Sequence, residues 1–259
     1  MMRTALSDTI VVLTVSATAF LCIIFIGGGR DNMNSILFWG LVPPILLLFY
    51  TWRLDRIERE PAGLVIKVFL LGAITTILAV LLESLAALGL SYLDLDESSN
   101  LYLLIDNFLA VALIEEFCKR MPVKRSIWKS PEFNYRFDAI VYCLASALGF
   151  AATENIVYMI SYGTGIALTR LIPVHSICAI YMGHYLGIAK MAEKAGDQKT
   201  YKRFRRLSLV IPTLIHGFWD FSLTSEDTIF YLAALGMIIV LTIISFNSLH
   251  KHSKEDVPV

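Results

Sequence analysis

Eight stretches of this chain are long and apolar enough to cross a membrane as α-helices, and no other feature constrains its fold as strongly. A helix needs about 20 mostly apolar residues to cross about 30 Å of hydrocarbon. The stretches are residues 9–27, 35–52, 63–90, 101–118, 138–163, 167–190, 207–223 and 228–249. They show no sustained alternation and are too long for barrel strands. We therefore expect an all-α, polytopic membrane helix bundle of about eight transmembrane helices.

The composition and the charge balance exclude most other classes of protein. Apolar and aromatic residues make up 56% of the chain and charged residues 17%, whereas soluble domains have about 45–50% and about 25%. Lys and Arg together equal Asp and Glu at 22 each, so the basic excess of a nucleic-acid-binding protein is absent. The expected surroundings are the lipid bilayer, and no nucleic-acid partner is expected.

The basic residues also predict the topology. All but two of the 22 Lys and Arg residues lie in the tails or at every second connection between the predicted spans, the exceptions being Arg30 and Arg170. Basic connections stay on the cytoplasmic side of a membrane. The N and C termini are therefore both predicted to be cytoplasmic, which requires an even number of spans.

Ionisable side chains inside the predicted spans need an explanation, because each charge deep in a bilayer costs about 2.5–3.5 kcal/mol on the lower estimates. Such residues mark candidate sites. They are Glu83, Asp106, Glu115, Glu116, Asp138, Glu154, Arg170, His175, His184, His216 and Asp220.

Two adjacent carboxylates, Glu115 and Glu116, lie near the end of the stretch 101–118. Adjacent helical residues point about 100° apart, so one carboxylate can face a site while the other holds a basic partner. Glu115 and Lys119 have the i,i+4 spacing of a helical ion pair. Glu116 and Arg120 have the same spacing. A salt-bridged helix end without a catalytic role is the alternative interpretation.

Glu154 lies well inside the stretch 138–163, beside Asn155 and one turn after Phe150. No basic residue within four positions can neutralise it. A purely structural interpretation of Glu154 therefore requires a partner on another helix or a protonated carboxyl group. The alternative interpretation is that Glu154 has a functional role.

The depth of Glu154 conflicts with that of Glu115 and Glu116. At a rise of 1.5 Å per residue, Glu154 should lie roughly 24 Å from Asp138, the predicted cytoplasmic start of its helix. Glu115 and Glu116 should lie only a few residues from the cytoplasmic end of theirs. Either the helix of Glu154 starts below the membrane, or the helices tilt strongly, or Glu154 belongs to another cluster.

Two histidines of the stretch 167–190 cannot share one site. His175 and His184 are nine residues apart, which places them on opposite faces of an ideal helix. Gly183 and Gly187 form a Gly-x-x-x-Gly pair that predicts close packing against another helix. His184 is therefore interpreted as a packed histidine, and His175 as a candidate site residue.

His216 and Asp220 lie four residues apart in the stretch 207–223, so both face one way. A carboxylate in this position can fix the imidazole tautomer or share a site with the ring. Pro212 lies one turn earlier and can bend the helix toward such a site.

The ionisable residues alone leave three classes of function open. Carboxylates and imidazoles gathered inside a bundle can activate water or bind a metal ion. The same groups can relay protons in a proton-coupled transporter, although no inverted repeat is evident. A catalytically inactive membrane scaffold is the third possibility.

The order and spacing of the motifs resemble the PrsW family of intramembrane proteases. This family belongs to a superfamily with the type II CAAX prenyl proteases and bacteriocin-processing proteases. The resemblance covers about residues 100–225. It is carried by Glu115-Glu116-Phe-Cys-Lys119, Phe137-Asp138-Ala-Ile-Val-Tyr142, Phe150-Ala-Ala-Thr-Glu154-Asn155, Arg170…Pro173-Val-His175…Gly183…Gly187 and His216-Gly-Phe-Trp-Asp220.

The resemblance implies an endopeptidase that cleaves a membrane protein or peptide in or next to the bilayer of a bacterial inner membrane. A site-1-type cut in a single-pass regulatory protein such as an anti-sigma factor is the activity that it implies. The implied catalytic residues are Glu115, Glu116, Glu154, His175, His216 and Asp220. The implied supporting residues are Lys119, Phe150, Asn155 and Arg170.

The resemblance leaves two mechanisms open. A Glu and a His can act without a metal, the first as general base and the second as oxyanion donor. Alternatively the site holds zinc, with ligands drawn from Glu116, Glu154, His175 and His216, although no His-Glu-x-x-His motif is present.

The chain is predicted to form a single integral membrane domain over residues 1–259. In this division, residues 1–90 form accessory helices and residues 100–225 carry the protease motifs. Residues 228–249 form the last transmembrane helix.

Overall fold

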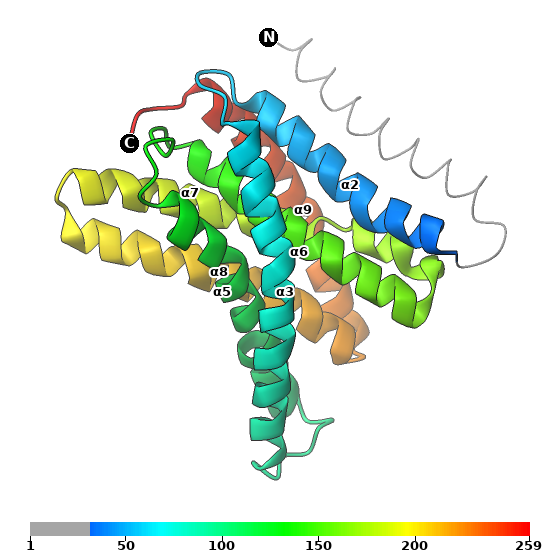
Figure 1. Cartoon of the computed structure of the whole chain (residues 1–259). Helices are drawn as coiled ribbons and strands as arrows, with labels where there is room; N and C mark the ends of the chain where they lie inside the picture. Colours follow the sequence, from blue (N-terminus) through cyan, green and yellow to red (C-terminus); the bar gives the residue numbers. More distant parts are fainter. Residues whose placement is uncertain (1–31) are drawn as a thin grey trace.

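A computed structural model describes residues 32–259 as an all-α bundle, with no strand in that part of the chain (Figure 1). The predicted first span, residues 9–27, lies outside the described residues. The α-helices are α2 (Met33–Leu54), α3 (Ala62–Ser91), α4 (Asn100–Ile105), α5 (Leu113–Pro122), α6 (Asp138–Tyr162), α7 (Val174–Lys194), α8 (Gln198–Thr224) and α9 (Thr228–Lys254). Two π-helical segments, η1 (Asp106–Ala112) and η2 (Val123–Ile127), and a 3-10 helix, η3 (Thr164–Leu171), complete the described helices.

Polar residues define where several of these helices begin. The side chains of Asn32, Ser99 and Asp227 each accept a hydrogen bond from a backbone N–H in the first turn of the helix that follows. Asp197 does the same for α8, where it accepts from Lys199 and Thr200. These caps satisfy backbone donors that a helix leaves free at its N-terminus.

Each of the seven predicted spans within residues 32–259 coincides with a helical segment. Five segments are long and apolar enough to cross a membrane, namely α2, α3, α6, η3 with α7, and α9. This confirms an all-α membrane protein. The total of about eight spans and the cytoplasmic position of both termini stay predictions.

The side of each helix that faces lipid is apolar. Large apolar side chains remain exposed along α3 and α9, including Ile74, Ile77 and Leu85 on α3 and Ile229 and Leu232 on α9. An exposed apolar surface of this extent is stable in hydrocarbon and unstable in water. These faces therefore contact the bilayer.

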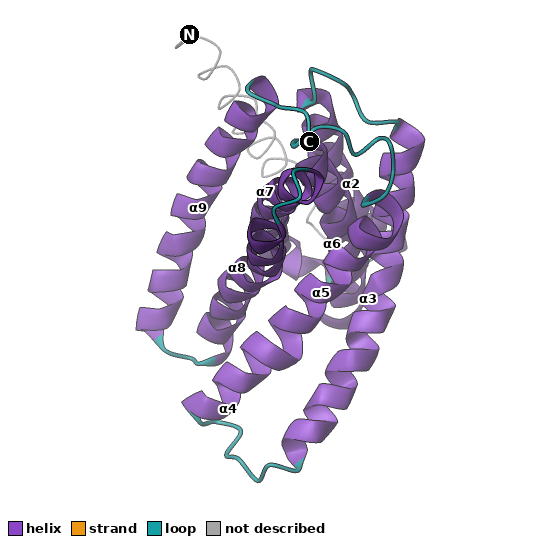
Figure 2. Ribbon diagram, turned by 90° about the vertical axis from the view of Figure 1, so that its left-hand side faces the viewer, coloured by secondary structure: helices purple, strands orange, loops and turns teal. Residues whose placement is uncertain are grey.

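The stretch that carries Glu115 continues past its predicted end. Helix α4, segment η1, α5 and η2 follow one another without a break from Asn100 to Ile127. This helical stretch lies beside α3 in Figure 2. Glu115 is therefore twelve residues from the end of the helical stretch, which places it deeper in the bundle than expected.

The predicted span 167–190 begins later than expected. Residues Thr164–Leu171 form the 3-10 helix η3, and helix α7 begins only at Val174, directly after Pro173. Proline lacks the N–H that a continuing helix needs and disfavours the helical conformation of the residue before it. The break places His175 in the first turn of α7.

Helix α6 is the centre of the bundle, with α2, α3 and α7 packed against it. Its most apolar window is 78% buried, compared with 17% for α2 and α9. The Gly-x-x-x-Gly prediction is confirmed, because a Cβ at Gly183 would lie 2.5 Å from the Cα of Ile140 on α6. A Cβ at Gly187 would lie 2.8 Å from the carbonyl oxygen of Arg136.

We expect Gly149→Leu to destabilise the fold more than a matched change at Gly89. A Cβ at Gly149 would overlap the backbone carbonyl of Phe69, which cannot move without separating α6 from α3. Overpacking of this kind costs about 3 kcal/mol or more when backbone must shift. Gly89 has no heavy atom within 4 Å of an added Cβ, so Gly89→Leu should unfold like wild type. Denaturation of both purified variants in detergent measures the difference, and equal stabilities would contradict the packing.

Candidate active site

Helix α5 brings two carboxylates and one ammonium group together. The Nζ of Lys119 lies 2.8 Å from Glu115 Oε2 and 2.8 Å from Glu116 Oε1. All three side chains are buried, and Lys119 is fully enclosed. The predicted Glu115–Lys119 pair is thus confirmed. The predicted Glu116–Arg120 pair is wrong, because Arg120 donates to the carbonyl of Arg205 and to Ser208 on α8.

Helix α8 supplies the histidine that meets this pair. The Nδ1 of His216 lies 3.0 Å from Glu116 Oε1. On the other side of the ring, Nε2 lies 3.2 Å from Asp220 Oδ2 and 3.8 Å from Glu115 Oε2. His216 and Asp220 thus face one way, as their spacing predicts. Gly217 allows this approach, because a Cβ there would lie 2.6 Å from the ring of Phe108 on η1.

His175, in the first turn of α7, joins two groups of charged residues. Its Nδ1 lies 2.9 Å from Lys119 Nζ, and its Nε2 lies 2.9 Å from Glu154 Oε2 on α6. The rings of His175 and His216 meet edge to face at 5.2 Å. His175 therefore belongs to the same cluster as His216, Lys119 and Glu154.

Glu154 has the inter-helix partner that its burial requires. Arg170, on η3, lies 2.9 Å from Glu154 Oε2 and donates through Nε to Asn155 Oδ1 at 2.8 Å. The Arg170 guanidinium also covers the ring of Tyr158 at 4.5 Å. Arg170 thereby connects the break before α7 to α6.

The conflict in depth between Glu154 and Glu115 disappears in the structure. Ser146 of α6 donates to the carbonyl of Lys119 at 2.6 Å, so this point of α6 lies beside α5. Asp138 is eight residues earlier, roughly 12 Å further toward the end of the helix. Phe150, one turn after Ser146, lies under Lys119 with its ring centre 4.6 Å from Nζ. Glu154 and Glu115 therefore belong to one cluster, because α6 starts well below it, and the expectation of a separate cluster for Glu154 is wrong.

One candidate histidine lies outside the cluster, as expected. His184 contacts His252 of α9 at 3.1 Å and Arg136 at 3.2 Å. It shares no contact with His175, which occupies the opposite face of α7. The nine-residue spacing predicted this separation.

Sequence reasoning left Glu83 of α3 without a role, although it lies close enough to Glu115, Glu154, Lys119 and His216 to interact with them electrostatically. Its Oε1 is buried and has no hydrogen-bond partner among the described residues. The available signal was a single carboxylate in a 30-residue apolar helix.

The cluster contains more negative than positive charge. Lys119 pairs with Glu115 and Glu116, and Arg170 pairs with Glu154. The fourth carboxylate, Asp220, contacts His216. Glu116 Oε2 is also buried with no partner in the described part of the chain. Burial without full compensation is costly, so further positive charge, as protons or as a metal ion, is required here.

The donor set fits a divalent metal ion. Glu115, His175 and His216 each offer one ligand atom, and these atoms lie within 4.8 Å of one another. Two histidines and one glutamate are the ligands of several zinc peptidases. The metal ligands were expected to come from Glu116, Glu154, His175 and His216, whereas this group contains Glu115 as its only carboxylate. Glu116 and Glu154 instead contact the far sides of the two imidazole rings.

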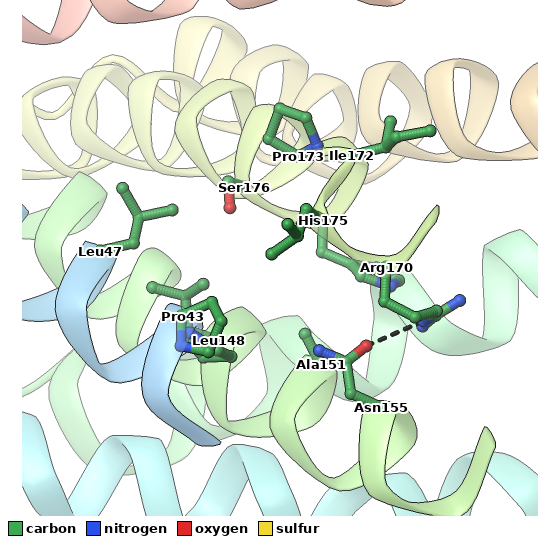
Figure 3. Close-up of a pocket in the computed structure, with 12 residues that line it drawn as sticks. Pro43, Leu47, Leu148, Ala151, Asn155, Arg170, Ile172, Pro173, His175 and Ser176 are labelled. Carbon is green, nitrogen blue, oxygen red and sulfur yellow. Dashed lines mark hydrogen bonds between the residues drawn. The ribbon is translucent and has the colours of Figure 1, made fainter. Parts of the chain in front are cut away.

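A cavity of about 80 Å³ opens beside His175 (Figure 3). It lies between α2, α6, η3 and the start of α7. Its polar lining consists mainly of Asn155, Arg170, His175 and Ser176, and its apolar lining includes Pro43, Pro44 and Leu148. Figure 3 shows the Arg170–Asn155 contact at one side of this cavity. The cluster is thus reached from the α2 side of the bundle.

Comparison with known proteins agrees with this geometry. A model of the "PrsW family intramembrane metalloprotease" matches residues 60–246. A relative named Protease PrsW from Oceanobacillus iheyensis is 33% identical over 229 residues, covering 87% of this chain and 99% of the relative.

Two further relatives, also named Protease PrsW, show similar agreement. The protein from Geobacillus kaustophilus is 32% identical over 80% of this chain and 87% of its own length. The protein from Bacillus subtilis is 32% identical over 77% of this chain and 88% of its own length. No solved structure matches. The chain therefore belongs to the PrsW family of intramembrane proteases and is an integral protein of a bacterial inner membrane.

Proposed function

We propose that this protease hydrolyses a peptide bond of a single-pass regulatory membrane protein, with Glu115, His175 and His216 holding a divalent metal ion such as zinc. The family supplies the peptidase activity. The proposal adds the ligand residues, the metal and the class of substrate.

The orientation of the two imidazole rings supports the metal most strongly. Nδ1 of His216 lies 3.0 Å from Glu116 Oε1, and Nε2 of His175 lies 2.9 Å from Glu154 Oε2. A proton on each of these nitrogens would leave the second nitrogen of each ring free to bind a metal ion beside Glu115. Metal-binding histidines commonly donate their other N–H to a carboxylate in this way, which fixes the tautomer.

The second nitrogen of His216 faces negative charges that a metal ion would complement. Nε2 of His216 faces the carboxylates of Asp220 and Glu115. A lone pair against two carboxylates is repulsive unless a positive charge lies between them. Nδ1 of His175 accepts from the ammonium group of Lys119, which occupies the corresponding position on that side.

The remaining residues would position water and move protons. Asp220 has a side chain that is 23% exposed, whereas Glu116 is fully enclosed. Asp220 is therefore the carboxylate placed to accept a proton from the attacking water and to return it to the leaving amine. Lys119 holds Glu115 and Glu116 in place and limits their repulsion. A bound metal ion would supply the Lewis acidity that polarises the scissile carbonyl.

The fold limits which substrates reach the site. The cluster is enclosed by α3, α5, α6, α7 and α8, and α2 forms one wall of the cavity beside His175. An extended, unfolded segment of a single-pass protein, such as an anti-sigma factor, fits this access better than a folded domain. In the eight-span topology that the basic residues predict, the continuous stretch from α4 to α5 and the helix α8 would cross the membrane as well.

We expect chelation to abolish cleavage by the purified protein in detergent. The assay compares single-pass membrane proteins from the same cell as substrates, with and without a chelator. Removing the metal should lower the rate by about 10³-fold or more, because the polarising charge is lost. Adding back zinc to the chelated enzyme should restore the rate.

Two outcomes would separate the parts of this proposal. Cleavage that resists chelation and prolonged dialysis would reject the metal and favour Glu115 as a metal-free general base. Absence of cleavage of every single-pass candidate, together with cleavage of a loosely folded soluble protein, would reject the substrate class. A Glu115→Gln variant prepared in parallel identifies contaminating proteases, because its residual cleavage cannot come from the proposed site.

A further inference from the structure

Three buried carboxylates meet at the other end of α6, and none of them belongs to the catalytic cluster. Asp55 follows the last residue of α2, Glu60 precedes α3, and Asp138 is the first residue of α6. All three side chains are at most 4% exposed. One carboxylate oxygen from each lies within 4.8 Å of the other two.

The surroundings of this cluster give it few hydrogen-bond donors and no ion pair. Asp138 Oδ2 accepts from the backbone N–H of Asn134 and Tyr135. The hydroxyl of Tyr142 donates to Glu60, and the backbone N–H of Glu60 donates to Asp55 at 3.3 Å. Among the described residues, no Lys or Arg lies within ion-pair distance of the three carboxylates.

The second oxygen of Asp138 is the clearest sign of an absent partner. Asp138 Oδ1 is fully buried and has no hydrogen-bond donor in the described part of the chain. The side chain of Asp138 is enclosed, and it lies against Glu60 closely enough for the two carboxyl groups to share a hydrogen. A buried carboxylate oxygen directed at another carboxyl group requires a proton or a cation between them.

Two members of this cluster, Asp55 and Glu60, lie in the loop between α2 and α3, outside the membrane-spanning helices. Desolvation, together with the nearby charge of Asp138, raises the pKa of Glu60 to about 9. Desolvation also raises the pKa of Asp55 to about 6. Both shifts arise mainly from burial of the carboxyl groups, and the charge of Arg59 offsets only part of the shift at Asp55.

We propose that Asp55, Glu60 and Asp138 form a second cation site, which binds a hard divalent ion such as Ca²⁺ and joins α2, α3 and α6 at one end of the bundle. Oxygen ligands at 2.3–2.6 Å are typical of Ca²⁺. Two ligands on opposite sides of such an ion are about 4.8 Å apart, the limit within which all three oxygens lie. No nitrogen or sulfur ligand is present in the group, which separates it chemically from the His-containing cluster.

The position of the site gives it a structural consequence. The loop that precedes α6 is also attached to the C-terminal tail. The backbone N–H of Arg136 donates to the carbonyl of Val257, and that of Phe137 donates to the carboxylate of Asp256. Ser253 donates to the carbonyl of Leu54, next to Asp55. An ion at this point would therefore hold the α2–α3 loop, the start of α6 and the tail as one unit, at the end of the helix that carries Glu154.

Terbium luminescence tests the proposal on the full chain in a neutral detergent. Tb³⁺ replaces Ca²⁺ at oxygen sites and emits when a nearby aromatic ring is excited. Trp52 donates to the carbonyl of Glu60 at 2.7 Å, and Tyr142 contacts its carboxylate. A His216→Gln background removes one ligand of the catalytic cluster. We expect sensitised emission that Ca²⁺ displaces, and at least a 10-fold loss of Tb³⁺ affinity in Asp138→Asn.

A matched variant controls for surface binding. Glu58 lies in the same loop, is exposed and contacts Asn134, so Glu58→Gln should bind Tb³⁺ like its parent. Emission that is equal in Asp138→Asn and its parent, or that Ca²⁺ does not displace, would overturn the site.

A thermal melt keeps the test independent of whether the variant folds. The Asn carbonyl can still accept from Asn134 and Tyr135, so Asp138→Asn should fold without Ca²⁺. Added Ca²⁺ should raise the Tm of wild type and leave that of Asp138→Asn unchanged. If Asp138→Asn does not fold, Glu60→Gln, which preserves the contact with Tyr142, is measured instead. A Ca²⁺ effect equal to that of wild type in the folded variant would contradict the proposal.

Discussion

Replacing His216 with Gln is expected to abolish proteolysis while the protein still accumulates in the membrane. The ring of His216 contacts Glu116 on one side and Asp220 and Glu115 on the other. Glutamine keeps an N–H that can donate to Glu116 but cannot supply the second ring nitrogen. Because residues that act as one catalytic unit are strongly interdependent, we expect the rate to fall by about 10³-fold or more.

His184→Gln is the matched control for this experiment. His184 is also enclosed between helices and contacts an arginine and a second histidine, but it lies outside the cluster. Cleavage of a single-pass substrate by the two purified variants, normalised to the amount of folded protein, gives the comparison. Wild-type activity in His216→Gln, or equal losses in both variants, would remove His216 from the proposed site.

Lys119→Met is expected to produce the second large effect, this time on both stability and activity. The ammonium group is fully buried and contacts Glu115, Glu116 and His175 at 2.8–2.9 Å. Removing it leaves two adjacent carboxylates buried without their shared cation. Breaking a buried ion pair on one side costs about 3–5 kcal/mol, so unfolding in detergent should shift by an amount of that order. Cleavage should be lost as well.

A double variant separates the two roles of Lys119. In Lys119→Met/Glu116→Gln, one uncompensated charge is removed together with the cation, so part of the lost stability should return. Activity should not return, because Glu116 also orients His216. Lys190→Met is the control, since Lys190 is a buried lysine that donates to the carbonyl of Trp128 far from the cluster along α7. If the double variant is no more stable than Lys119→Met, then Lys119 does not stabilise the fold by balancing the charge of Glu116.

Most of the helices, and several residues that the structure brings into one cluster, could be predicted from the sequence. Runs of apolar residues determined where the helices lie, because the cost of exposing backbone groups in lipid leaves few other structures. The spacing of His216 and Asp220, and that of His175 and His184, correctly separated the residues that share a face from those that do not. These are local properties, which the period of a helix determines.

The vertical offsets between helices could not be predicted in this way. If Asp138 marked the membrane boundary, it would lie level with the end of α5. Instead Ser146, about two turns later in α6, lies beside Lys119. Local periodicity carries no information about how far one helix slides along another. The offset is set by close approaches such as those at Gly149 and Gly183, which are tertiary contacts.

The partners of charged residues were harder to predict than their positions. Lys119 pairs with Glu115 as expected, and it also contacts Glu116 and His175, which was not expected. Arg120, equally spaced from Glu116, turns toward α8. Which of two adjacent cations enters a buried cluster depends on the face that the helix presents to its neighbours. Asp55, Glu60 and Asp138 were not grouped because more than 75 residues separate the first two from the third.

The wide turns of η1 determine the rotational phase of α5. A π-helical segment holds an additional residue relative to an α-helix of the same length, and η1 ends immediately before α5, which carries Glu115 and Glu116. Loss of one residue from η1 would rotate these side chains by about 100° and shift them by about 1.5 Å. The length of Asp106–Ala112 therefore fixes the face that α5 presents, whereas a change in the length of the loop from Tyr92 to Ser99 would leave that face unchanged.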